Sequence, residues 1–140
     1  MTAENLRTIE LTRTAKGSYE AVNDRGGRLP FGDGSSTDFT PVELLLVAMA
    51  GCSAIDVDYL TSRLAEPTGF RVSGAGEKLS DEQGNHMGGI TVTFDIQFPE
   101  GEDGDRARTR LPDAVARSRD RLCTVSRTVQ LSAPVTYVTT

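Results

Sequence analysis

Two cysteines carry most of the chemistry that this chain can perform. Cys52 lies in the run AMAGCSAIDV, and Cys123 opens the run CTVSRTV, 71 residues further along. A thiolate is a nucleophile, and two thiols that meet can form and break a disulfide. They can meet only if their elements pack side by side, with Cα atoms within about 7 Å. One hypothesis is therefore a redox-active pair; the other is that both cysteines are small buried hydrophobic side chains.

The single histidine and the metal-ligating residues exclude other kinds of site. His86 lies in DEQGNHMGG, a segment typical of a flexible turn, so we expect a solvated side chain rather than a member of a Ser–His–Asp triad. Structural zinc needs about four ligands and catalytic zinc three. One histidine and two cysteines distant in the sequence make a poor set. We therefore expect no metal, and we expect no cofactor.

Length and charge narrow the class of protein. The chain has 140 residues, 37% of them hydrophobic, which fits one domain over residues 1–140. Its net charge of −5, without a basic stripe, argues against nucleic acid as a partner. We find no signal peptide and no apolar run of about 20 residues, so we expect no membrane and a cytoplasmic location. A reducing compartment of that kind keeps cysteines as thiols.

The clearest element is a long helix over residues 41–64 with Cys52 in its middle. Thr40 and Glu43 form a capping box at its start, and Pro41 suits the first helical position. Residues 44–53 are apolar or small on every face, a pattern typical of a buried helix. A monomer of this size seldom surrounds such a helix, so we expect sheets or a second subunit to cover it.

The remaining pattern indicates an α+β fold with the order β-β-α-β-β-α-β. Apolar and polar residues alternate along residues 88–98, which predicts an antiparallel sheet with one buried face. The other elements that we predict are strands over residues 6–13, 19–23, 70–79 and 128–138 and a helix over residues 105–123 whose inner stripe contains Leu111, Val115 and Leu122. Cys123 then ends the second helix, where we expect a more accessible thiol than in the middle of the first.

Both cysteine motifs resemble those of one family. The pattern P-x-E-L-L-L-x-A-x-A-G-C in residues 41–52, followed by SAIDV, and the run CTVSRTV in residues 123–129 are similar to the two motifs of the OsmC/Ohr superfamily. The SAIDV continuation is more similar to the OsmC-like branch. This resemblance implies an intertwined homodimer in which antiparallel sheets wrap central helices, and such a dimer would bury the apolar helix.

The resemblance also implies an activity. Active members of the superfamily are thiol peroxidases that reduce organic hydroperoxides or hydrogen peroxide in oxidative and osmotic stress defence. By position, Cys52 resembles the peroxidatic cysteine and Cys123 the resolving one, with an external thiol or lipoyl group as the reductant. The alternative is an OsmC-like protein that binds small molecules, or is otherwise associated with stress, and has little peroxidase activity.

The residues that activate the thiol in the family are not clearly matched. Val42 stands where the family has a glutamate, and Glu43 is nine residues before Cys52. On a straight helix that spacing puts them on opposite faces, about 13 Å apart along the axis. Glu43 could serve Cys52 only across a dimer interface or through a bent helix start, and its capping role already explains its presence.

The charges near Cys52 also give no clear group that would activate its thiol. None of the family's arginine positions can be assigned among Arg13, Lys16, Arg25 and Arg28. Asp56, one helical turn after Cys52, disfavours the thiolate unless it pairs with an arginine. These features motivate the alternative function, whereas the two cysteine motifs motivate the peroxidase.

Overall fold

A computed structural model describes residues 4–140, which form two compact units. Within the described chain, the first unit ends at Leu45 and the second runs from Leu46 to Thr140. Helix α1 (Pro41–Ser62) begins in the first unit and continues into the second. Each unit is described by itself. The prediction of one domain over residues 1–140 stays a prediction.

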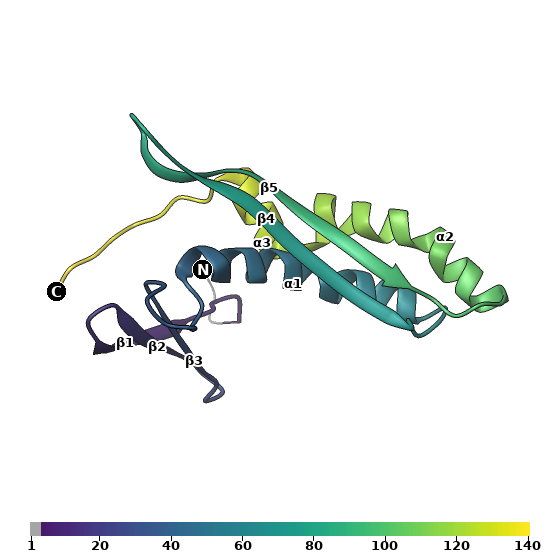
Figure 1. The fold of residues 1–140 in the computed structure, drawn as a ribbon, viewed down its shortest axis with the longest axis horizontal. Coiled ribbons are helices and arrows are strands. Elements are labelled where there is room, and N and C mark those ends of the chain that lie inside the picture. Colours follow the sequence, from purple (N-terminus) through teal and green to yellow (C-terminus); the bar gives the residue numbers. More distant parts are fainter. Residues whose placement is uncertain (1–3) are drawn as a thin grey trace. The chain divides into compact units, whose positions relative to one another are not determined.

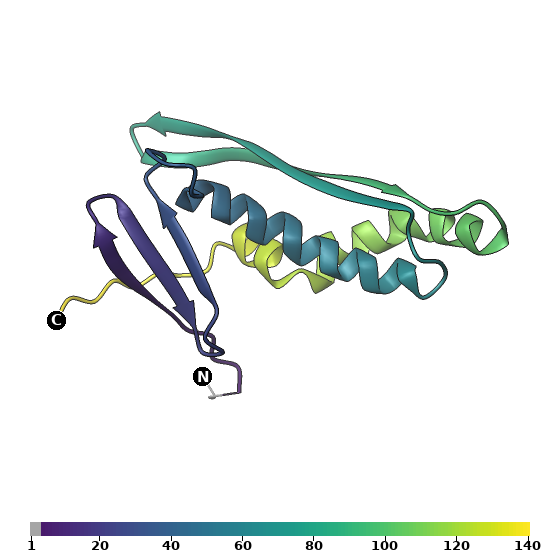
Figure 2. The same ribbon diagram turned by 60° about the horizontal axis from the view of Figure 1, so that its bottom comes forward.

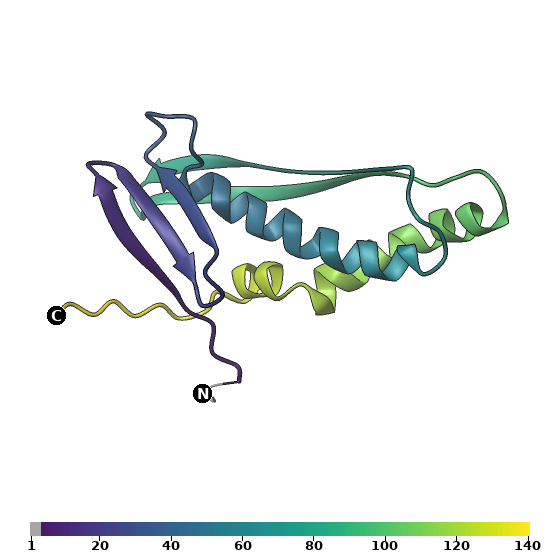
Figure 3. The same ribbon diagram turned by 90° about the horizontal axis from the view of Figure 1, so that it is seen from below.

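The first unit contains a three-stranded antiparallel sheet (Figure 3). Its strands, in spatial order, are β1 (Ile9–Ala15), β2 (Ser18–Asn23) and β3 (Arg28–Gly32). Gly17 lies in the turn between β1 and β2, where its φ of 75° favours glycine. The sequence prediction missed β3, because its turn-rich surroundings resemble a loop. The Asn23 side chain accepts hydrogen bonds from the N–H groups of Arg25 and Gly27 and so closes the β2–β3 turn.

Helix α1 confirms the capping prediction. The N–H of Thr40 donates to Oε1 of Glu43 over 2.9 Å, and the N–H of Glu43 donates to Oγ1 of Thr40 over 3.3 Å. These two bonds satisfy backbone donors that have no partner inside the helix. The helix has 22 residues and ends at Ser62, two residues before the predicted end.

Only one stripe of α1 is buried within the described chain, so the expectation that sheets or a second subunit cover the whole helix stays a prediction. The buried side chains recur every fourth residue: Met49, Ser53, Val57 and Thr61. On the opposite face Ile55 and Tyr59 are 57% and 67% exposed. By length and composition alone α1 could cross a membrane, which corrects the argument that no segment is long and apolar enough. In water, this apolar face favours a covering partner.

The second unit contains a long hairpin of β4 (Gly69–Asp81) and β5 (Gly84–Gln97) (Figure 1). The predicted antiparallel pairing and alternation are confirmed: the apolar side chains of β5 are half-buried, and the polar ones between them are exposed. Helix α1 lies along this hairpin (Figure 2), and Gly74 contacts Leu46 and Ala50. His86 is solvated as predicted, but it lies in β5 rather than in a turn.

Beyond the hairpin the chain is helical. The helical segments are α2 (Glu102–Arg117), a π-helical turn η1 (Ser118–Leu122) and α3 (Thr124–Leu131). The hidden face of α2 and η1 carries small side chains, Ala107, Ala114 and Ser118, which permit close packing. Leu122, predicted for the inner stripe, is exposed.

The predicted strand over residues 128–138 is wrong. Its first part belongs to α3, which ends where Ser132 adopts a left-handed φ of 54°. Residues 133–140 form neither helix nor strand, and Tyr137 is 92% exposed. A strand requires a partner, and none of the described strands pairs with this segment. The observed order is therefore β-β-β-α-β-β-α-α, with η1 between the last two helices, and it remains α+β.

Candidate active site

The two thiols lie next to each other in the second unit. The sulfur atoms of Cys52 and Cys123 and a carboxylate oxygen of Asp56 all lie within 4.8 Å of one another. Both cysteines are free. Cys52 and Asp56 are one turn apart on α1 and share a face, whereas Cys123 immediately precedes α3. Two cysteines that are 71 residues apart in the sequence are thus close together in space, as the hypothesis of a redox-active pair requires.

The π-helical turn η1 places Cys123. The N–H of Cys123 donates to the carbonyl oxygen of Ser118, five residues earlier, over 2.9 Å. Cys123 then leaves the helical conformation, with ψ of 100°, and becomes the N-cap of α3. Its sulfur accepts a hydrogen bond from the N–H of Ser126 over 3.3 Å. The chain thus turns twice around Cys123, and both turns hold its side chain in place.

The accessibility of the two thiols is the reverse of the prediction. Cys123 is fully buried, while Cys52 is only half-buried. The prediction assumed that a cysteine at a helix end projects into solvent. An N-cap side chain instead folds back over the first turn of its own helix, and that contact encloses the sulfur.

The surroundings of Cys52 raise its pKa above the ordinary value. The largest cause is desolvation by burial, because a thiolate loses hydration there. The Cys123 thiol and the negative charge of Asp56 act in the same direction, whereas a hydrogen bond from the Val125 backbone opposes them. Cys52 therefore rests as a thiol at neutral pH.

Asp56 is held by a hydroxyl group rather than by an arginine. The Oγ of Ser118 donates to Oδ2 of Asp56 over 3.0 Å, and Ser118 is buried. Within residues 4–140, no ion pair includes Asp56, so the alternative of an arginine partner is not realised there. The carboxylate consequently keeps its effect on the neighbouring thiol.

The other sequence candidates have structural partners of their own. Glu43 lies in the first unit, where hydrogen bonds from the backbone and then the hydroxyl of Thr40 lower the pKa of its carboxyl. Its role in catalysis stays a prediction. Arg28, one of the four unassigned cations, pairs with Glu20 in the same unit. His86 lies 3.6 Å from Asp81 across the end of the hairpin.

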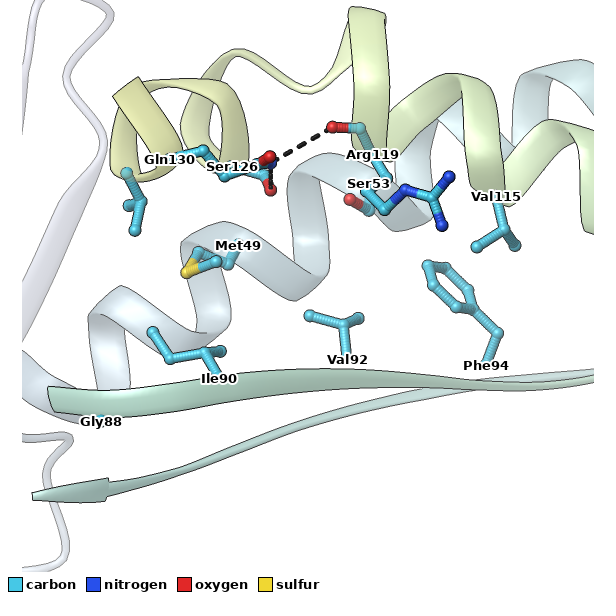
Figure 4. Close-up of a pocket in the computed structure, with 11 residues that line it drawn as sticks. Met49, Ser53, Gly88, Ile90, Val92, Phe94, Val115, Arg119, Ser126 and Gln130 are labelled. Carbon is cyan, nitrogen blue, oxygen red and sulfur yellow. Dashed lines mark hydrogen bonds between the residues drawn. The ribbon is translucent and has the colours of Figure 1, made fainter. Parts of the chain in front are cut away.

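A cavity of about 490 Å³ lies between α1, β5 and the C-terminal helical segments (Figure 4). Its floor is the apolar face of β5, with Ile90, Val92 and Phe94, and Met49 and Ser53 of α1 form another wall. The lining includes Ser53, which follows Cys52 in the sequence, and Ser126, whose N–H donates to the sulfur of Cys123. Neither cysteine lines the cavity. Gln130 donates to Oγ of Ser126 and to the carbonyl of Arg119 at the rim.

Sequence reasoning missed three residues that organise the thiols: Ser118, Val125 and Ser126. Ser118 is 62 positions from its partner Asp56, so no local pattern connects them. Val125 and Ser126 act through backbone N–H groups, which any residue type supplies. The one available signal was a cysteine directly before a helical segment.

Comparison with known proteins agrees with the motifs. The sequence profile of the OsmC-like protein family matches residues 32–138. The chain belongs to the OsmC-like family. No curated protein matches the sequence at a significant level.

Solved structures share this family's fold at low sequence identity. A hypothetical protein from Aquifex aeolicus VF5 has a TM-score of 0.73 at 20% identity, over 92% of this chain and 90% of its own. An OsmC-like protein from Mycoplasma pneumoniae has a TM-score of 0.72 at 16% identity, over 91% of this chain and 89% of its own. The organic hydroperoxide resistance protein OhrB of Bacillus subtilis has a TM-score of 0.60 at 14% identity, over 90% of this chain and 92% of its own. These matches show the OsmC-like α+β fold.

Proposed function

We propose that this OsmC-like protein is a thiol-dependent peroxidase that reduces organic hydroperoxides or hydrogen peroxide in oxidative or osmotic stress defence. The observation that carries the proposal is the proximity of two free thiols that are 71 residues apart in the chain. The organic hydroperoxide resistance protein among the structural neighbours supports the same class of substrate.

Cys52 performs the first step. Its thiolate attacks one peroxide oxygen, so that an S–O bond forms and the O–O bond breaks. The other oxygen leaves with a proton as an alcohol or as water, and Cys52 becomes a sulfenic acid. Cys52 is the better candidate for this step because it is half-buried, whereas Cys123 is enclosed.

Cys123 performs the second step. Its sulfur attacks Sγ of Cys52, the S–S bond forms, and the S–O bond breaks with loss of water. An external dithiol or lipoyl group then returns both cysteines to thiols and is itself oxidised to a disulfide. The separation of at most 4.8 Å requires only a small movement before the two sulfurs bond.

Consumption of cumene hydroperoxide, with dihydrolipoamide as reductant, tests the proposal. We expect Cys52→Ser to reduce consumption to the rate of the reductant alone. Cys123→Ser is the matched control: it should keep one fast turnover per chain, lose multiple turnovers, and accumulate overoxidised Cys52. Wild-type consumption that survives in Cys52→Ser would overturn the proposal.

Two observations favour a second candidate, a small-molecule binding protein with little peroxidase activity. The raised pKa of Cys52 disfavours the thiolate, and the cavity lined by Ser53 and Ser126 has the volume and apolar lining of ligand sites. Tight binding of an apolar fluorescent probe that Val92→Trp prevents, together with no consumption of peroxide, would favour this candidate.

We infer further that the protein is a cytoplasmic homodimer. The exposed face of α1, with Val47, Ile55 and Tyr59, supports a second copy as its cover, since the family resemblance implies paired central helices. Light scattering of the wild type should give a molar mass of two chains, and that of Ile55→Asp should give the mass of one chain. Thr91→Asp, on an exposed strand position, is the control. A wild-type monomer at micromolar concentration would contradict this inference.

A further inference from the structure

The cysteine pair and Asp56 form a group of three metal-ligating side chains. Two thiols and one carboxylate place their ligand atoms within 4.8 Å of one another. Two of the three, Cys52 and Asp56, stand one turn apart on α1, so a rigid helix fixes their spacing. The prediction of no metal rested on the separation of the cysteines along the sequence, and the fold removes that separation.

The spacing is close to that of a tetrahedral site. With metal–sulfur bonds of about 2.3 Å and metal–oxygen bonds of about 2.1 Å, ligand atoms lie roughly 3.5–3.8 Å apart. Rotation about side-chain torsions can bring atoms from within 4.8 Å to that range. Three protein ligands leave a fourth position open, and the half-buried Cys52 gives it access to solvent.

Two of the three ligands are oriented by a second group. Ser118 donates to Asp56 over 3.0 Å, and the N–H of Ser126 donates to Cys123 over 3.3 Å. Such outer contacts hold ligands in position and often alter metal affinity by about 10- to 100-fold. The hydroxyl bond to Asp56 comes from a buried side chain and uses only one carboxylate oxygen.

The ligand types select the class of metal. Two sulfurs disfavour Mg²⁺ and Ca²⁺, which prefer oxygen, and favour Zn²⁺ and similar thiophilic ions. Two thiolates and a carboxylate carry three negative charges, which one divalent cation largely neutralises. On binding, the two thiols lose their protons as the metal–sulfur bonds form.

We propose that the reduced protein binds one thiophilic divalent cation, such as Zn²⁺, through Cys52, Asp56 and Cys123. Occupation of this site and reaction with peroxide require the same sulfurs, so the bound ion would hold the thiols in a protected state. That consequence rests on the proposed peroxidase function, whereas metal binding itself does not.

Cobalt titration of the reduced, metal-free protein tests the proposal. We expect sulfur-to-cobalt absorption in the near ultraviolet and tetrahedral bands in the visible, saturating at one Co²⁺ per chain and abolished by added Zn²⁺. Asp56→Asn should weaken binding by about tenfold or more. Asp58→Asn, the same change on the same helix outside the cluster, is the matched control and should bind as the wild type does.

Two outcomes would overturn the metal proposal: no sulfur-to-cobalt absorption, or equal binding by Asp56→Asn and Asp58→Asn. Alkylation of the folded wild type with N-ethylmaleimide should also abolish the absorption. This step tests the need for the sulfurs without a cysteine substitution that could prevent folding. Peroxide consumption measured separately with chelator distinguishes the two proposals. Cobalt bands without consumption would refute only the peroxidase, and consumption without bands would refute only the metal site.

Discussion

Cys52 and Cys123 carry the same functional group in contrasting surroundings. Cys52 lies within a regular helix, half-buried, beside the carboxylate of Asp56. Cys123 lies where η1 gives way to α3, fully buried and tied to the N–H of Ser126. The difference supports the tasks proposed above, in which Cys52 meets the oxidant and Cys123 then meets the oxidised Cys52.

The largest expected difference between the two is in stability. Cys123→Ala removes a fully buried sulfur and an N-cap contact, which together cost about 2–3 kcal/mol. Cys52→Ala removes a half-buried sulfur and should cost less than about 1 kcal/mol. Urea denaturation of both variants, read at unchanged m-value, measures the difference. Equal losses would show that Cys123 is not the more tightly enclosed residue.

A second comparison uses alkylation of the reduced protein in the presence of chelator. Iodoacetamide should modify Cys52 about tenfold faster than Cys123, because only Cys52 is partly open to solvent. Peptide mass spectrometry assigns the modified sulfur. Faster modification of Cys123 would reverse the proposed order of the two steps.

The pH dependence of the Cys52 reaction sharpens this comparison. Burial raises its pKa above that of an ordinary thiol, so alkylation of Cys52 in the folded protein should reach its plateau at a higher pH than alkylation of the unfolded chain. The sign for stability follows. The neutral Cys52 thiol makes its full contribution to folding stability at pH values below its pKa in the unfolded chain. That contribution is lost as the pH rises through its higher pKa in the folded protein. A reaction midpoint at or below that of the unfolded chain would contradict the raised pKa.

The smallest expected effect comes from the charge of Asp56. It is the least of the causes that raise the Cys52 pKa, so Asp56→Asn should speed alkylation of Cys52 at pH 8 by less than about threefold. Asp58→Asn serves as the control and should change nothing. A slower reaction in Asp56→Asn would mean that the carboxylate assists the thiol instead of opposing it.

Much of the fold could be predicted because its signals are local. The capping box of Thr40 and Glu43 fixed the start of α1, and alternation along residues 88–98 identified the buried face of β5. Helix α3 was missed because its Thr and Val residues suit strands, and tertiary contacts overrode that propensity. The predicted burial of α1 depended on a partner that no local pattern describes.

The candidate site was predictable only in part. Family motifs identified Cys52 and Cys123, because each stands in a run that resembles one of the two motifs of the OsmC/Ohr superfamily. The Asp56–Ser118 contact and the backbone donors at the start of α3 depend on packing between distant segments. For the same reason the sequence suggested the wrong thiol as the more accessible one. Accessibility depends on what packs against a residue, and the helix-end position of Cys123 did not reveal it.

The most direct test of the account is the intact mass and thiol count of the reduced, metal-free protein after one equivalent of cumene hydroperoxide. We predict that each chain loses the mass of two hydrogen atoms and that both thiols disappear. Digestion should then give a disulfide-linked pair of peptides that contain Cys52 and Cys123 of a single chain. Retention of both thiols, or addition of oxygen atoms to either sulfur without a disulfide, would contradict the claim that these two sulfurs work as a pair.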